Sequence, residues 1–136
     1  MKYFYTLTLA LIICWLPSCT FNTKTINNPV LNKHGKKIIY YELKDLILPD
    51  EQLNFTGYSV TSGNKTTSEL EIRITNAERL PQNKDELRSI SIKISQAFKL
   101  ALKDKKQYQT YKVKFVTRKD QGRTATIATT IKATEF

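Results

Sequence analysis

The side chains that could transfer a proton or attack a substrate are few in this chain and lie far apart. His34 is its only histidine, and it lies in a polar segment where we expect no packed pocket to orient the ring. Both cysteines, Cys14 and Cys19, lie close to the amino terminus. Nucleophilic catalysis needs an oriented base beside the nucleophile, so the parts of a Ser-His-Asp or Cys-His site are missing.

Adjacent carboxylates occur as isolated pairs, Asp50-Glu51 and Asp85-Glu86. The first pair follows Pro49 in a predicted turn, and the second lies in the predicted first turn of a helix, where the helix dipole favours negative charge. Neither pair has the clustered ligands of a metal site, and the 4 glycines are too dispersed for a phosphate-binding loop. We expect no enzyme, no metal and no cofactor; a hydrolase that uses two separated carboxylates stays open as an alternative.

Basic and aromatic side chains share one face of a predicted strand near the carboxyl end. The residues on this face are Tyr108, Lys112, Lys114 and Arg118. If that face of the sheet is open, they form a platform for an anionic glycan, a lipid headgroup or an acidic protein. The alternative is a solvated edge strand, where lysine discourages aggregation and where Glu69 and Glu71 pair with Lys112 and Lys114 across neighbouring strands.

The amino-terminal residues have the order of a signal peptide. Lys2 lies near the start, residues 6–16 are almost wholly apolar, and the small residue Ser18 comes just before Cys19. The apolar run is too short for a membrane-spanning helix, which needs about 20 residues. We therefore predict a removable leader over residues 1–18.

The segment Leu16-Pro17-Ser18-Cys19 resembles the lipobox of bacterial lipoproteins, although Pro17 is an unusual occupant of its position. In that family the cysteine thiol takes a diacylglycerol and the chain is cut just before it, which implies that Cys19 is lipidated and becomes the first mature residue. Two acyl chains hold a protein firmly on a membrane, because each buried methylene contributes about 0.8 kcal/mol to the free energy of membrane binding. An ordinary secretory signal with an unmodified Cys19 and an uncleaved anchor are the alternatives.

The chain is strongly basic, with 22 Lys and Arg against 12 Asp and Glu and a net charge of +10. Such a charge favours nucleic acid, an anionic membrane surface or an acidic partner, or is simply a solvated surface. Because the leader directs export, we expect the membrane, through lipid on Cys19, and possible binding of an anionic envelope component or an acidic protein, but no nucleic acid. By resemblance to lipoprotein sorting, Thr20 permits passage to the outer membrane; we expect the periplasmic face and leave the choice of membrane open.

The chain is predicted to divide into three parts. Residues 1–18 form the signal peptide, and residues 19–36 form the lipidated cysteine and a flexible tether, because Asn, Thr and Lys dominate this segment. Such a tether reaches about 20 to 25 Å. Residues 37–136 form a single domain.

Periodicity within the domain predicts its first strands. The compact apolar run 38–43 favours a strand that is buried on both faces. Residues 55–61 and 68–75 read as two strands joined by a hairpin turn at Gly63-Asn64, since both residues tolerate positive φ. In the second strand, apolar and charged residues alternate, so one face belongs to the core.

The rest of the domain combines one helix with a second hairpin. Apolar residues recur at three- and four-residue steps over 84–103, and Asn83 with Glu86 has the form of a capping box. The runs 111–115 and 125–132 alternate like strands around a loop at 120–122.

The predicted fold is α+β, a two-layer sandwich of one amphipathic helix on a four- to five-stranded antiparallel sheet in the order β-β-β-α-β-β. The predicted function is a membrane-anchored envelope lipoprotein with a non-enzymatic binding or scaffolding domain. The alternative is a tethered inhibitor or immunity-type protein that acts against a toxic hydrolase.

Overall fold

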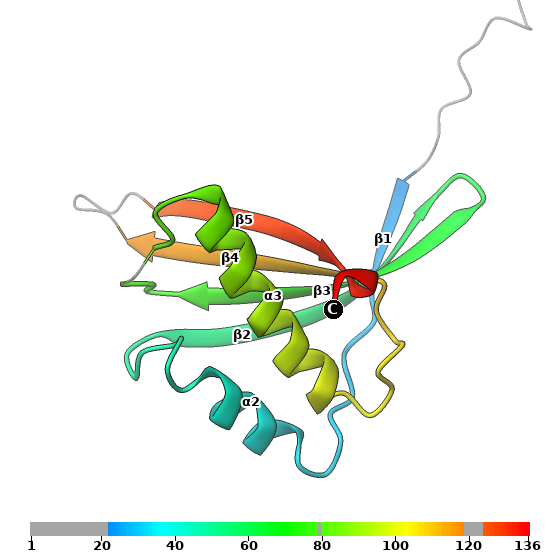
Figure 1. Ribbon diagram of the computed structural model, residues 1–136. Coiled ribbons are helices and arrows are strands. Elements are labelled where there is room, and N and C mark those ends of the chain that lie inside the picture. Colours follow the sequence, from blue (N-terminus) through cyan, green and yellow to red (C-terminus); the bar gives the residue numbers. More distant parts are fainter. Residues whose placement is uncertain (1–21, 79, 119–123) are drawn as a thin grey trace, which may run out of the picture.

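A computed structural model describes residues 22–78, 80–118 and 124–136. Five strands form one sheet in the spatial order β1-β2-β3-β4-β5, and two helices cover one of its faces (Figure 1). The elements are β1 (Asn22–Ile26), α2 (Gly35–Leu43), β2 (Gln52–Ser62), β3 (Lys65–Thr75), α3 (Lys84–Ala101), β4 (Thr110–Arg118), β5 (Thr124–Lys132) and the 3-10 helix η2 (Ala133–Glu135). The predicted α+β class and its two layers are confirmed.

The sheet is mixed, because β3 and β4 run parallel while the other neighbouring strands are antiparallel. Helix α3 supplies the crossover that a parallel pair requires. The predicted β2–β3 hairpin is confirmed, with Gly63 at φ 60° in its turn. That angle suits glycine at the first central position of a two-residue turn. The antiparallel prediction is wrong only at the β3–β4 pair.

Helix α2 replaces the strand that was predicted over residues 38–43. Of its apolar side chains, Ile39 and Leu43 are buried, and their four-residue spacing is that of one helical face. The amino-terminal end of α2 packs closely on α3, since a Cβ atom at Gly35 would lie 2.6 Å from the carbonyl oxygen of Ala101. An apolar run on both strand faces is also an apolar run around a helix, so packing against α3 decided the outcome.

The segment predicted as a flexible tether is ordered from Asn22 onwards. It contains β1, and residues 30–32 are joined to the end of α3 by backbone hydrogen bonds. Asn32 donates its backbone N–H to Ala101 at 2.8 Å, and Lys103 donates to Val30 at 2.8 Å. The tether prediction is therefore wrong for residues 22–36, while the leader and Cys19 lie outside the described residues.

The core lies between the sheet and the helices. Its buried residues include Leu70, Ile72 and Ile74 of β3, Ile94, Ala97 and Phe98 of α3, and Tyr111, Val113 and Phe115 of β4. The predicted alternation in β3 and the predicted helical stripe are confirmed. Helix α3 begins as predicted, because the Asn83 side chain accepts the backbone N–H of Glu86 at 2.8 Å.

Beyond the helices, β1 and the joined ends of β2 and β3 form a three-stranded arm (Figure 1). We define the arm as residues 22–26, 58–62 and 65–69, none of which is buried. Its strands are linked by backbone pairing and by polar side chains. Lys24 Nζ, for example, lies 3.4 Å from Glu69 Oε1 and 3.7 Å from the centre of the Tyr58 ring.

Candidate functional site

Tyr108 does not belong to the predicted basic platform. It is 1% exposed, and its hydroxyl donates to the carbonyl oxygen of Asn27 at 2.6 Å. Burial raises the pKa of Tyr108 to about 12. The residue precedes β4, which begins at Thr110, so strand alternation does not fix the direction of its side chain. Space for the ring exists because Gly57 beneath it has no Cβ atom.

Lys112 and Lys114 lie on the sheet in β4, where their neighbours on β3 include acidic side chains. Lys114 Nζ lies 2.8 Å from Glu71 Oε2, and Arg73 Nη2 lies 3.2 Å from Glu71 Oε1. Burial on its own would raise the pKa of Glu71. The hydrogen bond and charge of Lys114, with those of Arg73, outweigh burial, so the pKa lies below its ordinary value of 4.5.

The predicted pairing across the sheet is thus confirmed for Glu71 with Lys114, while Glu69 pairs with Lys24 instead. Arg118 pairs through its backbone with Thr124 of β5, and its side chain lies outside the described part of the chain. Two of the four predicted platform residues therefore share the open face. Since one of them, Lys114, is already paired with a carboxylate, this face is a weak candidate for an anionic ligand.

The polar residues singled out for chemistry have structural surroundings. His34 is exposed just before α2, without a side-chain capping bond. The Glu51 carboxylate accepts the backbone N–H groups of Leu48 and Glu78, both at 2.9 Å. Within residues 22–78, 80–118 and 124–136, no three His, Cys, Asp or Glu side chains are grouped closely enough to hold a metal ion.

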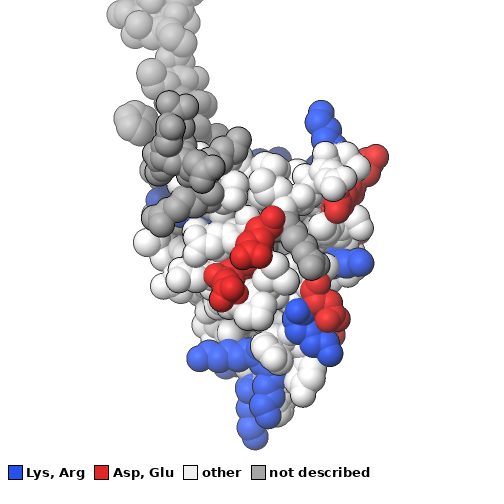
Figure 2. All heavy atoms as spheres, turned by 90° about the vertical axis from the view of Figure 1, so that its left-hand side faces the viewer, with Lys and Arg blue, Asp and Glu red and all other residues white. Residues whose placement is uncertain are grey.

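Helix α2 exposes two adjacent aromatic side chains. Tyr40 and Tyr41 are 69% and 66% exposed, and their rings meet edge to face with centroids 5.9 Å apart. The exposed lysines beside them are Lys36, Lys37 and Lys44. We call these five residues the α2 surface. In Figure 2, Lys and Arg side chains gather at the lower end of the molecule, which is the end where α2 lies in Figure 1.

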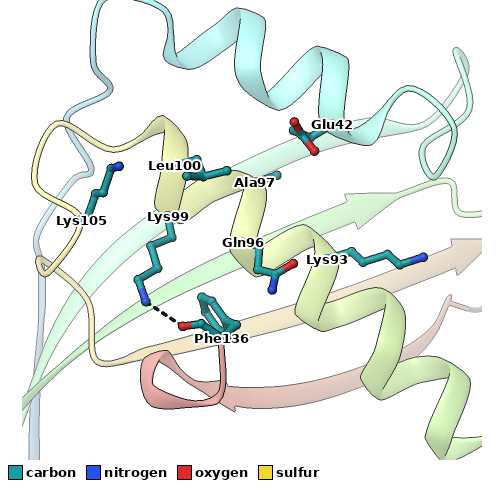
Figure 3. A pocket seen from close by; sticks show the side chains of 8 residues that line it. All are labelled: Glu42, Lys93, Gln96, Ala97, Lys99, Leu100, Lys105 and Phe136. Carbon is teal, nitrogen blue, oxygen red and sulfur yellow. Dashed lines mark hydrogen bonds between the residues drawn. The ribbon is translucent and has the colours of Figure 1, made fainter.

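A groove of about 580 Å³ runs between α2, α3 and the carboxyl end of the chain (Figure 3). Its lysines are Lys93, Lys99 and Lys105, and its apolar part consists of Ala97, Leu100 and Phe136. Lys99 Nζ donates to the carbonyl oxygens of Ala133 and Phe136, both at 3.0 Å. It therefore fixes the carboxyl end, whereas the exposed Lys93 and Lys105 flank the groove. We call this the α2–α3 groove.

A second groove, of about 410 Å³, lies between α2 and the start of β2. Lys36, Tyr40 and Lys44 of the α2 surface line it together with apolar side chains. The apolar lining residues are Ile39, Leu43, Ile47, Leu48, Pro49 and Leu53. We call this the α2–β2 groove. Helix α2 therefore lines both grooves, but it reaches the α2–α3 groove only through the Glu42 carboxylate. Each groove combines lysines with apolar side chains.

The side chains of this arrangement can bind a ligand that is both anionic and partly apolar. Lysines supply donors for carboxylate or phosphate groups, and the apolar floors and tyrosine rings supply contact area. The sequence prediction missed the site because 38–43 was assigned to a buried strand. The signal that could have revealed it is the four-residue spacing of Ile39 and Leu43, which places Tyr40 and Tyr41 on the other side of a helix.

Comparison of the chain with protein-family models, with curated proteins and with solved structures gives no match. None of the helices in the described part of the chain is both long and apolar enough to cross a membrane. The interpretation of the site therefore rests on its own geometry.

Proposed function

We propose that this chain is a bacterial envelope lipoprotein, anchored through a diacylglycerol on Cys19, whose domain binds an anionic and partly apolar envelope component without catalysing a reaction. The anchor is supported by the lipobox-like segment Leu16-Pro17-Ser18-Cys19 after an apolar run. The binding role is supported by one observation above all. Lysines and apolar side chains line a groove on each side of α2, with the exposed Tyr40 and Tyr41 on the same helix.

Lysine and tyrosine side chains contribute differently to binding in such a site. An ion pair between an exposed lysine and an anionic group of the ligand contributes only about 0.2–1 kcal/mol. The lysines therefore select a negatively charged ligand but add little to its affinity. Aromatic anchors such as Tyr40 and Tyr41 contribute more, because truncation of an interfacial tyrosine that acts as a hot spot costs about 2 kcal/mol or more. A ligand that combines carboxylate or phosphate groups with alkyl or aromatic groups uses both.

The binding role is tested by titrating ¹⁵N-labelled protein with peptidoglycan fragments, which carry carboxylates. We expect amide shifts along α2 and around Leu100, and a loss of affinity of at least about tenfold in the Tyr40→Ser/Tyr41→Ser variant, since tenfold corresponds to about 1.4 kcal/mol. Lys112→Ser is the matched control on the open sheet face and should bind normally. Shifts confined to the sheet face, or no binding to the fragments, to acidic peptides or to anionic vesicles, would contradict the role.

The anchor is tested by intact mass spectrometry of protein purified from detergent-solubilised membranes. We expect a mature chain that begins at Cys19 and carries a diacylglyceryl group, and we expect this mass to be lost in Cys19→Ala. A chain that keeps its leader, or one that begins elsewhere without lipid, would contradict the lipoprotein assignment. Nucleic acid would then return as a partner that suits the positive charge.

A tethered inhibitor or immunity-type protein against a toxic hydrolase is the second candidate. It is favoured by the exposure of Tyr40 and Tyr41, because exposed aromatic side chains of this kind are enriched among the residues that dominate protein interfaces. The positive charge would then require an acidic target. A deletion strain that is no more sensitive to the toxin than its parent would count against this candidate.

A further inference from the structure

The arm determines where the chain enters the described fold. In the β1–β2 pairing, Asn22 lies opposite Ser62, which immediately precedes the turn at Gly63-Asn64. Ile26, at the other end of β1, lies opposite Tyr58. The first described residue is thus at the tip of the arm, and β1 runs from the tip toward the body of the domain (Figure 1).

The connection to the proposed lipid site is short. Only Thr20 and Phe21 separate Cys19 from Asn22 in the sequence. Because successive Cα atoms are about 3.8 Å apart, three steps span at most about 11 Å. A lipid on Cys19 would therefore hold Asn22 within about 11 Å of the headgroups, about half the reach expected of a flexible tether over the whole 19–36 segment.

The side chains at the tip suit a headgroup layer. Asn22, Ser62, Asn64 and Lys65 are exposed, and three of them are neutral and polar while the fourth is positive. Glu69 is the one carboxylate of the arm, and it is paired with Lys24. The tip therefore presents donors and one positive charge to phosphate groups and places no carboxylate beside them.

Contacts between its three strands stabilise the arm. All five residues of β1 pair with β2, and the hydroxyls of Thr61 and Thr66 lie 3.0 Å apart across the β2–β3 pair. Five residues of strand span about 17 Å. Figure 1 places α2 at the end of the molecule that is remote from the arm's tip.

We propose that the arm's tip, residues 62–65 with Asn22, contacts the phospholipid headgroups of the anchoring membrane, and that the arm holds the α2 surface away from them. This inference rests on the proposed lipidation of Cys19 and narrows the proposed function. The α2 surface faces the space beyond the membrane, so its ligand is not the headgroup layer to which the protein is anchored.

The test uses single fluorescent labels on the lipidated protein in vesicles that contain phosphatidylglycerol and a phospholipid spin-labelled on its headgroup. Asn64→Cys places the label at the tip, and Asp45→Cys places it just after α2; both native residues are exposed. Each introduced thiol is the only reactive one, since Cys14 leaves with the leader and Cys19 carries lipid. We expect several-fold stronger quenching at position 64, and Thr66→Cys provides a second tip label if the turn variant does not fold.

The outcomes separate the inference from the proposed function. Equal quenching at the two positions, or stronger quenching at 45, in protein whose mass shows a lipid on Cys19 overturns the inference alone. Protein that lacks the lipid overturns the lipoprotein assignment and this inference with it. Insertion of 20 Gly and Ser residues between Phe21 and Asn22, which gives a reach of about 25 Å, should remove the difference in quenching. If the difference persists, the short connection is not its cause and the inference fails.

Discussion

Replacement of Gly57 by alanine should destabilise the domain severely. A Cβ atom at Gly57 would collide with the carbonyl oxygen of Asn27 and the hydroxyl of Tyr108, and would lie 2.7 Å from Cζ of the Tyr108 ring. None of these groups can move freely. Asn27 donates its N–H to the Gly57 carbonyl at 2.8 Å, and Tyr108 donates its hydroxyl to the Asn27 carbonyl at 2.6 Å.

The expected loss combines two effects. Overpacking of a filled core costs about 1–3 kcal/mol. Displacement of the buried Tyr108 hydroxyl from its acceptor costs about 1–3 kcal/mol more. The free energy of unfolding should therefore fall by about 2–6 kcal/mol, a large share of the roughly 5–15 kcal/mol of an ordinary domain. At about 4 °C per kcal/mol, the melting temperature should fall by about 8–24 °C.

The assay is urea and thermal unfolding of the unlipidated Cys19→Ala protein, followed by circular dichroism. Gly63→Ala is the matched control, because a Cβ atom there meets nothing within 4 Å while φ is 60°; it should cost only the left-handed backbone penalty of about 1–2 kcal/mol. Tyr108→Phe removes the colliding oxygen. In a double-mutant cycle, Gly57→Ala and Tyr108→Phe should therefore show a coupling energy of about 0.5 kcal/mol or more. The reasoning would be refuted if Gly57→Ala lowered the free energy of unfolding no more than Gly63→Ala does and showed no coupling to Tyr108→Phe.

Two further predictions concern Glu71 and Asn83. Because the pKa of Glu71 in the folded protein lies below 4.5, its ionised form stabilises the fold above pH 4.5, and this contribution is lost as the pH falls through the folded pKa. Glu71→Gln should therefore be less stable than the native protein at pH 7, and urea titrations should show the gap closing below pH 4.5; a gap independent of pH would contradict this. Asn83→Ala should cost about 1 kcal/mol through loss of the α3 cap, while Asn83→Ser should retain most of it; equal losses in the two variants would argue against the cap.

The elements that were predicted correctly have a burial pattern that matches one period. In β3, Leu70, Ile72 and Ile74 are buried in alternation with charged residues, and in α3 the buried residues follow a helical stripe. The run 38–43 does not distinguish a strand from a helix. Its apolar residues would occupy both faces of a strand and most sides of a helix. In the folded chain this segment packs against α3, as the close approach of Gly35 to Ala101 shows, and such contacts join residues that are far apart in the sequence.

Strand β1 was beyond prediction for a different reason. All five of its residues are exposed, so no hydrophobic pattern marks it. It exists because its backbone pairs with the part of β2 that extends past the helices, from Tyr58 to Ser62. A composition rich in Asn, Thr and Lys predicts disorder only when the backbone has no partner, and here the hairpin provides one.

The candidate site was predicted in part. Lys112 and Lys114 were correctly assigned to the sheet face opposite Tyr111, Val113 and Phe115, because strand alternation determines that arrangement. This face was expected to be exposed, but both lysines are only partly exposed and the neighbouring Glu71 is buried. Tyr108 was misplaced since it lies before β4, where alternation does not apply. The α2 surface was missed because α2 itself was predicted as a strand, and the two conformations expose different side chains.

The distribution of charge explains how the grooves beside α2 can attract an anion. On the sheet face, Glu69 and Glu71 pair with Lys24 and Lys114. Among the side chains that line the two grooves, Glu42 carries the only carboxylate. Exposed charges are screened within about 10 Å at 0.1 M salt, so the groove lysines act on a ligand that lies close to them. An anionic ligand is therefore attracted to the grooves, and this attraction should weaken as salt is added.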